Sequence, residues 1–336
     1  MMIKAPILGI NRLRFETDGP GITTLVAFMK CPLKCKYCIN KECHDPLPKQ
    51  DITHLSGTIK YYSPLELYNK VKIDNIYFQA TNGGITFGGG EPALYSDFIT
   101  EFRKICGDNW HLNIETSLNV DPKHIKALSS VINHFIIDIK DLNPLIYKKY
   151  TGASIYPVIL NLLYLKKIGR AQDTTIRVPY IPGYNKPVDV LKSIDRLISS
   201  GFANIYGFDY ITQIPSRDAQ ESRKEAMDPE IEGKEICEEL SKIRKEIASI
   251  NGLELHSDIC NYIGDCAGTC PKCDWELQKL QKQLDEKCLK GENLNYSLTN
   301  KFSRKKITIA NLPPLLEGKI VDPLSWEAEV SDLDLI

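Results

Sequence analysis

The chain has 336 residues, of which 43% are hydrophobic, a share sufficient for a large buried core. Its formal net charge of −1 gives no overall field that would attract nucleic acid or an anionic membrane. No apolar run approaches the roughly 18 residues of a membrane span, and residues 1–14 lack the charged, apolar and cleavage regions of a signal peptide. We therefore expect a cytoplasmic protein without nucleic-acid or membrane partners.

The middle of the chain alternates short apolar runs with segments whose apolar residues recur every three or four positions. The expected strands are 24–29, 85–87, 112–114, 135–139, 175–181 and 205–211. The expected helices are 64–71, 97–105, 122–131, 158–168 and 188–198. Strands alternating with helices indicate parallel strands joined by crossover helices. Six such units predict an α/β fold of the partial (β/α)6 barrel type, because a complete eight-unit barrel typically needs a longer chain.

The chain changes character after the sixth expected strand. The charged stretch 216–250 is expected to be mostly helical, with interruptions at Pro229 and Gly233. A further helix is expected at 274–283, and residues 291–336 contain no motif that indicates a function. We therefore expect a barrel at 1–258, a cysteine-containing metal-binding extension at 259–290 and a tail at 291–336.

Eleven cysteines are many for a cytosolic chain of this length. Secreted disulfide scaffolds are usually shorter, and cytosolic cysteines that cluster in sequence are more often metal ligands. The two groups are Cys31, Cys35, Cys38 and Cys43, and Cys260, Cys266, Cys270 and Cys273. Ordinary thiols are expected at Cys106, Cys237 and Cys288, and a surface thiol and a surface imidazole at Cys43 and His44.

The first group has the spacing Cys-x3-Cys-x2-Cys at Cys31, Cys35 and Cys38. Three thiolates can hold a 4Fe–4S cluster and leave its fourth iron open. The amino and carboxylate groups of S-adenosylmethionine can chelate that iron, and an electron from the cluster can then break the sulfonium C–S bond to give a 5′-deoxyadenosyl radical. Tyr37 is expected beside the adenine. On spacing alone, a zinc site completed by Cys43 or His44 is the alternative.

A glycine-rich turn favours the iron–sulfur interpretation. Gly89, Gly90 and Glu91 close an expected strand about 50 residues after the first cysteines. Glycine permits close backbone approach, and Glu91 can accept a hydrogen bond from the ammonium group of S-adenosylmethionine. Both motifs follow successive expected strands, so we expect them at the same end of the barrel.

At this point the chain resembles the activating enzymes of glycyl radical enzymes, a radical S-adenosylmethionine family, with pyruvate formate-lyase activating enzyme as the nearest type. The resemblance covers about residues 15–212 and is carried by the cysteine motif and by the segments 18–22 and 83–92. It implies a partial (β/α)6 barrel and removal of a hydrogen atom from a glycine of a partner protein. It also implies an electron donor of the flavodoxin or ferredoxin type.

The resemblance also carries over positions at later strand ends, which are Glu115, Thr116, Asp138, Lys140 and Arg177. It implies that the carboxylates help to hold a monovalent cation near S-adenosylmethionine, and that Arg177 lies near the same ligand. Glu115 departs from the family's aspartate. The alternatives are that the carboxylates bond loop amides and that Arg177 is a buried structural partner of Asp138.

The second group repeats the spacing at Cys266, Cys270 and Cys273, but Lys272 stands where the aromatic residue is expected. It follows no barrel strand, and Cys260 can supply a fourth thiolate, which closes a cluster. We expect an auxiliary 4Fe–4S cluster, structural zinc with His256 as a substitute ligand, or free thiols. Activating enzymes with extra clusters carry them before the glycine turn, so the C-terminal position is more similar to peptide-modifying radical enzymes.

Three functions follow from these observations. The favoured one is activation of a glycyl radical enzyme. The second is a radical S-adenosylmethionine maturase that modifies a peptide or small molecule with the auxiliary cluster near the substrate. The third is a non-catalytic metal-binding protein, which the combination of cysteines, Tyr37 and the Gly-Gly-Glu turn disfavours.

Overall fold

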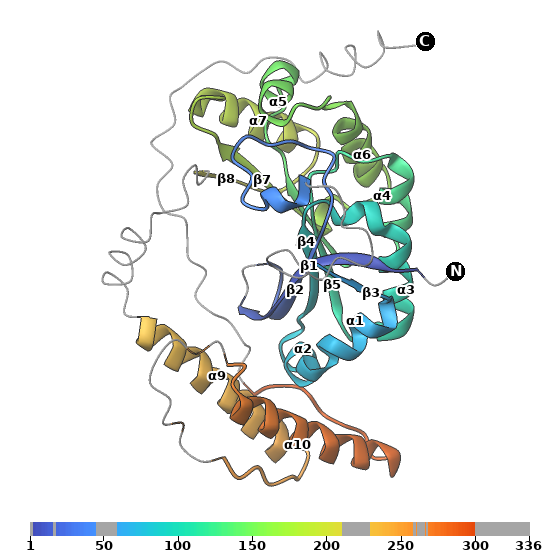
Figure 1. Cartoon of the computed structure of the whole chain (residues 1–336), viewed down its shortest axis with the longest axis vertical. Coiled ribbons are helices and arrows are strands. Elements are labelled where there is room, and N and C mark those ends of the chain that lie inside the picture. Colours follow the sequence, from blue (N-terminus) through green and yellow to red (C-terminus); the bar gives the residue numbers. More distant parts are fainter. Residues whose placement is uncertain are drawn as a thin grey trace.

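The fold was obtained as a computed structural model of the 336-residue chain (Figure 1). The structure describes residues 3–15, 18–44, 59–209, 229–257, 260, 266 and 268–299. Residues 210–228 and 300–336 lie outside this description. The helix expected over 216–228 and most of the expected tail therefore stay predictions.

The centre of the molecule is one eight-stranded sheet in the order β3-β1-β2-β4-β5-β6-β7-β8. Its strands are β1 (Ala5–Phe15), β2 (Ile22–Phe28), β3 (Lys60–Tyr62), β4 (Gly84–Gly89), β5 (His111–Thr116), β6 (His134–Asp138), β7 (Thr174–Tyr180) and β8 (Asn204–Asp209). The six strands β2 and β4–β8 run parallel to one another, which confirms the predicted partial (β/α)6 barrel.

The two remaining strands extend the sheet beyond β2. Strand β1 is antiparallel to β2 and to β3. The sequence did not predict either strand. Both are antiparallel additions without a crossover helix, so the alternation of strands and helices gave no signal for them.

Helices connect the parallel strands and cover the outer side of the sheet (Figure 1). They are α1 (Pro64–Val71), α2 (Asn75–Thr81), α3 (Ser96–Cys106), α4 (Pro122–Leu128), α5 (Pro144–Thr151), α6 (Tyr156–Lys167) and α7 (Pro187–Ser199). Local chemistry sets their starts. Before α1, the Ser63 hydroxyl accepts from the Glu66 N–H and the Glu66 carboxylate accepts from the Ser63 N–H, a reciprocal cap.

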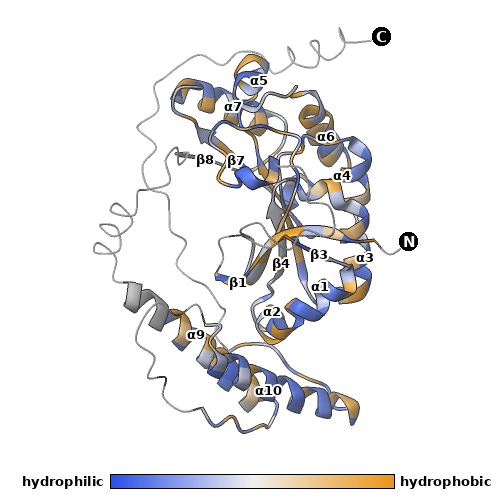
Figure 2. Cartoon of the chain, viewed as in Figure 1, coloured by the Kyte–Doolittle hydropathy of each residue, from blue (hydrophilic) through white to orange (hydrophobic). Residues whose placement is uncertain are grey.

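Apolar side chains fill the space between the strands and the helices. Fully buried examples are Phe28, Phe87, Phe98 and Phe102, whose rings meet at centroid distances of 5.6 to 5.9 Å in edge-to-face pairs. Figure 2 shows hydrophilic and hydrophobic residues side by side along each covering helix, as expected of helices with one buried face. Within the described part of the chain, no helix is long and apolar enough to span a membrane.

Two long helices, α9 (Pro229–Ile250) and α10 (Pro271–Leu289), lie side by side next to α2 (Figure 1). They share a core with α2 and with the adjoining ends of β1 and β2. Pro229 begins α9, where a missing N–H costs nothing. The interruption expected at Gly233 is wrong, because α9 continues through this residue. Helix α10 is longer than the expected 274–283, and the predicted boundary at residue 258 stays a prediction.

Candidate active site

The first cysteine group lies in the loop that follows β2. The Lys34 N–H donates to the Thr151 carbonyl at 2.8 Å, and the Cys38 N–H donates to the Cys35 carbonyl at 3.3 Å, so the loop is tied to the end of α5 and folded on itself. The thiols of Cys31, Cys35 and Cys38 are all half-buried. Burial is the main cause that raises the pKa of Cys31, and it raises the pKa of Cys35 to about 11.

These three thiols suit a cationic cluster. In addition to burial, Cys35 and Cys38 both raise the pKa of Cys31, and Cys38 raises the pKa of Cys35, so thiolates in this group are costly without positive charge between them. Iron supplies that charge when a 4Fe–4S cluster binds. In the described residues, no three His, Cys, Asp or Glu side chains lie close enough to hold a single metal ion. A cluster separates its thiolates more widely, because each binds a different iron.

Cys43 lies close to this loop, in a 3-10 helix at Lys41–His44. Its side chain is only 2% exposed, and its thiol donates to the Phe28 carbonyl at 3.5 Å. The expectation of a surface thiol is therefore wrong. Burial and the nearby Cys38 raise the pKa of Cys43 to about 12, which favours its neutral form.

The glycine turn lies directly against the segment that leads to Cys31. The Gly90 N–H donates to the Phe28 carbonyl at 2.8 Å, and the Glu91 N–H donates to the Lys30 carbonyl at 2.7 Å. A Cβ atom on Gly90 would lie 2.2 Å from the Lys30 carbonyl oxygen, and Gly89 has φ +92°. Only glycine permits both features. The two predicted motifs are thus brought together at the carboxyl ends of β2 and β4.

Glu91 is fully buried beneath this turn. One carboxylate oxygen accepts from the Thr116 hydroxyl at 2.6 Å and the Ala93 N–H at 3.2 Å. The other accepts from the N–H and hydroxyl of Ser117, at 2.9 and 2.6 Å. Burial raises the pKa of Glu91, and these four hydrogen bonds oppose that rise. Glu91 therefore fastens the turn to the end of β5, and its predicted contact with an ammonium group stays a prediction.

Charged side chains from three adjacent strands meet at the same end of the barrel. The guanidinium of Arg177 on β7 lies between Glu115 on β5, at 3.0 Å, and Asp138 on β6, at 2.6 Å. The Lys140 ammonium lies 3.5 Å from the other Asp138 oxygen. The alternative in which Arg177 pairs with Asp138 is therefore confirmed, since the two side chains form an ion pair. The roles at S-adenosylmethionine and at a monovalent cation stay predictions.

The electrostatic effects in this group follow from burial and pairing. Burial raises the pKa of Glu115, and the Arg177 charge opposes that rise. Burial also acts to raise the pKa of Asp138, but the charges of Lys140 and Arg177 outweigh it and the pKa is lowered. Two carboxylates face two cations here, so this end of the barrel is polar but nearly balanced in charge. Such a surface suits a zwitterionic ligand.

Tyr37 reaches across from the cysteine loop to the loop after β7. Its hydroxyl donates to the Pro182 carbonyl at 3.3 Å. Its ring lies 5.7 Å from that of Tyr184 and 6.2 Å from that of Tyr150, in edge-to-face and tilted arrangements. The sequence reasoning missed Tyr150 and Tyr184, since aromatic residues in loops and short helices carry no spacing signal. The three rings form an aromatic wall beside the cysteines.

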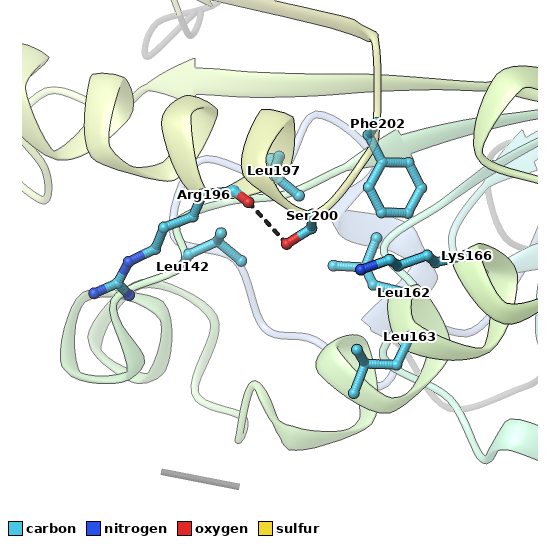
Figure 3. A pocket seen from close by; sticks show the side chains of 8 residues that line it. All are labelled: Leu142, Leu162, Leu163, Lys166, Arg196, Leu197, Ser200 and Phe202. Carbon is cyan, nitrogen blue, oxygen red and sulfur yellow. Dashed lines mark hydrogen bonds between the residues drawn. The ribbon is translucent and has the colours of Figure 1, made fainter. Parts of the chain in front are cut away.

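An apolar crevice between α6 and α7 is separate from this group (Figure 3). Within it, the Ser200 hydroxyl donates to the Arg196 carbonyl at 2.8 Å. Its lining consists of Leu142, Leu162, Leu163, Lys166, Arg196, Leu197, Ser200 and Phe202. None of the predicted site residues is among them, so the crevice is not part of the candidate site.

Comparison with known proteins identifies the superfamily to which the chain belongs. Residues 25–212, more than half of the chain, match the model of the radical SAM superfamily. The pyruvate formate-lyase-activating enzyme of Listeria monocytogenes is 31% identical over 190 residues, which cover 54% of this chain and 72% of the relative. The chain therefore belongs to the radical SAM superfamily, as its motifs predicted. The cofactors of that superfamily are S-adenosylmethionine and a 4Fe–4S cluster.

Two further relatives are also activating enzymes. The (2S)-3-sulfopropanediol dehydratase activating enzyme of Klebsiella oxytoca is 26% identical over 231 residues, covering 53% of this chain and 72% of the relative. The 4-hydroxyphenylacetate decarboxylase activating enzyme of Clostridioides difficile is 27% identical over 235 residues, covering 54% and 73%. The predicted resemblance to activating enzymes is thereby confirmed.

Proposed function

We propose that this protein activates a glycyl radical enzyme by removing a hydrogen atom from one of its backbone glycines. Cys31, Cys35 and Cys38 would hold a 4Fe–4S cluster, which would supply the electron for cleavage of the C5′–S bond of S-adenosylmethionine into methionine and a 5′-deoxyadenosyl radical. That radical takes the glycine hydrogen, so that 5′-deoxyadenosine and a glycyl radical are the products. A flavodoxin- or ferredoxin-type protein returns the electron.

The observation that carries this proposal is the junction of two motifs at the carboxyl ends of β2 and β4. Cys31, Cys35 and Cys38 would hold the cluster, and the hydrogen bond from the Glu91 N–H to the Lys30 carbonyl fixes the glycine turn beside them. The turn lacks side chains at Gly89 and Gly90, so its backbone can approach a ligand closely. Tyr37 and its aromatic neighbours would exclude water from the same space.

The position of the second cysteine group supports activation over the maturase alternative. The α9–α10 pair packs beside the beginning of β2, where Ile22 is part of the shared core. The first cysteines follow the other end of this seven-residue strand, which is about 20 Å long at roughly 3.3 Å a residue. A centre on the second group would therefore lie away from the radical, whereas the maturase alternative requires it beside the substrate.

Anaerobic turnover tests the radical chemistry. The protein is reconstituted with iron and sulfide, then mixed with S-adenosylmethionine and dithionite, and 5′-deoxyadenosine is quantified. We expect no product from Cys35→Ala and reduced but measurable product from Cys270→Ala, because only the first group leaves an iron open. Cys288→Ala, which removes an exposed thiol on α10, is the matched control. Equal loss in the Cys35 and Cys270 variants would contradict the assignment of roles.

A further inference from the structure

A fifth cysteine, Cys237, lies close to the second group in space. Cys237 lies on α9, more than 20 residues before Cys260 in the sequence, and no spacing rule connects them. In the structure, the Cys237 thiol is hydrogen-bonded to the thiols of Cys273 and Cys260. Burial raises the pKa of Cys237, and Cys266 is also close enough for its negative charge to raise it further. The sequence predicted an ordinary thiol at Cys237 and gave no signal for this proximity.

The helix register explains why Cys237 faces this group. Leu240 and Arg244 follow it by three and seven residues, which places all three on one face of α9. Both neighbours contact the cysteine segment. A Cβ atom on Gly268 would lie 2.1 Å from Leu240, so Gly268 lies directly over this face. Gly268 also has φ +74°, a conformation that favours glycine.

Hydrogen-bond donors already point at the sulfur atoms of the group. The Gly268 N–H donates to Cys266 Sγ at 3.4 Å, and the Cys273 N–H donates to Cys270 Sγ at 3.5 Å. Arg244 donates to Cys273 Sγ at 3.8 Å. Such donors stabilise thiolates and tune thiolate-bound metals. Cys270 also caps the start of α10, where the helix dipole favours negative charge.

The buried side chain of Arg244 connects Cys273 to other residues of the shared core. It is 2% exposed, pairs with Glu276 at 2.8 Å and donates to the Tyr77 hydroxyl at 2.6 Å. Its Nε is buried and has no hydrogen-bond partner among the described residues. A fixed guanidinium beside Cys273 would offset part of the negative charge of a metal centre with four thiolate ligands.

We propose that Cys237, Cys266, Cys270 and Cys273 are the four thiolate ligands of a second metal centre, and that Cys237 rather than Cys260 fills the fourth position. Cys260 also reaches Cys237, but its side chain is exposed, whereas Cys237 is half-buried on a helix and Cys273 is buried. A ligand on a helix is held in place before metal arrives. The centre would join α9 to the start of α10. This inference extends the predicted second centre but does not depend on the activity proposed for the first.

Metal retention tests the proposal in a full-length background that lacks the first cluster, with Cys31, Cys35 and Cys38 all replaced by Ala. Anaerobic reconstitution is carried out with iron and sulfide in one arm and with zinc in the other. Bound iron, sulfide and zinc are then measured as a chelator is added. About four iron per chain would indicate a 4Fe–4S cluster, and about one zinc a tetrahedral site, which requires the four thiols to move closer together than they lie in the structure. Retention of neither metal would overturn the proposal.

Single variants in this background identify the fourth ligand. We expect Cys237→Ala to lose metal to the chelator at least about tenfold faster than Cys288→Ala, which is the control for an exposed thiol. We expect Cys260→Ala to behave like the control. Alanine is the best helix former, so α9 should persist, and circular dichroism checks this. Metal retention in Cys237→Ala equal to the control, or loss from Cys260→Ala equal to that from Cys237→Ala, would overturn the assignment.

Discussion

The ion pairs of Arg177 show how single residues shape the candidate site. Asp138 and Arg177 are register partners on neighbouring strands, and Glu115 stands on the next strand along. One guanidinium therefore links three strand ends. A partly buried pair of this kind contributes little net free energy, but removal of one partner leaves a costly unpaired charge. The group fixes the geometry of the barrel mouth more than it stabilises the fold.

The lowered pKa of Asp138 predicts a pH-dependent stability. A carboxyl group with a folded pKa below its ordinary value of 3.8 stabilises the protein above that pH, and this stabilisation is lost as the pH falls through the folded value. We expect Asp138→Asn to lower the free energy of unfolding at pH 7 by about 1–3 kcal/mol. The difference from wild type should shrink below pH 3.8. Anaerobic denaturant titrations at several pH values measure it.

The control for this variant is Asp173→Asn. Asp173 also pairs with an arginine, Arg170, at 3.0 Å, but its side chain is 47% exposed. Exposed pairs contribute at most about 1 kcal/mol, so this variant should differ little from wild type. A difference for Asp138→Asn that stays constant or grows on acidification would contradict the account of Asp138.

The sequence indicated several residues of the candidate site, but it did not indicate all of the contacts among them. The positions of Glu115, Asp138 and Arg177 came from the resemblance to activating enzymes, and the structure places their side chains together at adjacent strand ends. The pair of Arg177 with Asp138 was among the predicted alternatives, but the pair of Arg177 with Glu115 was not, because one arginine can reach several carboxylates from a strand end. The burial of Glu91 by Thr116 and Ser117 was also missed, since these residues belong to a different strand and the sequence shows no link between them.

At the scale of elements, the contact between the ends of β2 and β4 decides the geometry of the site. Gly90→Ala places a Cβ atom against the Lys30 carbonyl, so we expect the turn to move and the free energy of unfolding to fall by about 1–3 kcal/mol. Affinity for S-adenosylmethionine should fall as well. Thermal unfolding and equilibrium dialysis with labelled S-adenosylmethionine measure the two effects.

Gly9→Ala is the matched control, because a Cβ atom on Gly9 meets no atom within 4 Å and its φ is not positive. This variant should lie within about 0.5 kcal/mol of wild type. If both variants behaved alike, close packing at Gly90 would not be the feature that holds the turn.

The parallel strands and long amphipathic helices could be predicted, but two short helices could not. Helix α2 is apolar on most sides because it lies between the barrel and α9, so it shows no helical period. Helix α5 has Leu145 80% exposed, which breaks the period. Its ends did carry a signal, since Asn143 caps it before Pro144 and Gly152 ends it with a positive φ.

At the scale of the whole molecule, the chain combines a radical SAM barrel with a helix pair that holds the second cysteine group. Arg12 on β1 joins the two parts, since it pairs with Asp74 at 2.7 Å and with Asp274 on α10 at 2.9 Å. Sequence spacing could not place this pair, because the contacts join residues more than 200 positions apart. The helix pair packs beside the beginning of β2, whereas Cys31 follows the other end of that strand.

The most direct test of the account is electron paramagnetic resonance of a partner protein. The reconstituted enzyme, S-adenosylmethionine and a reductant are mixed anaerobically with a glycyl radical enzyme encoded beside its gene. We predict a glycyl radical signal on the partner, matched by 5′-deoxyadenosine, and neither with Cys35→Ala. If 5′-deoxyadenosine formed without a radical on the partner, while a small peptide encoded nearby was modified, the proposed activation of a glycyl radical enzyme would be contradicted.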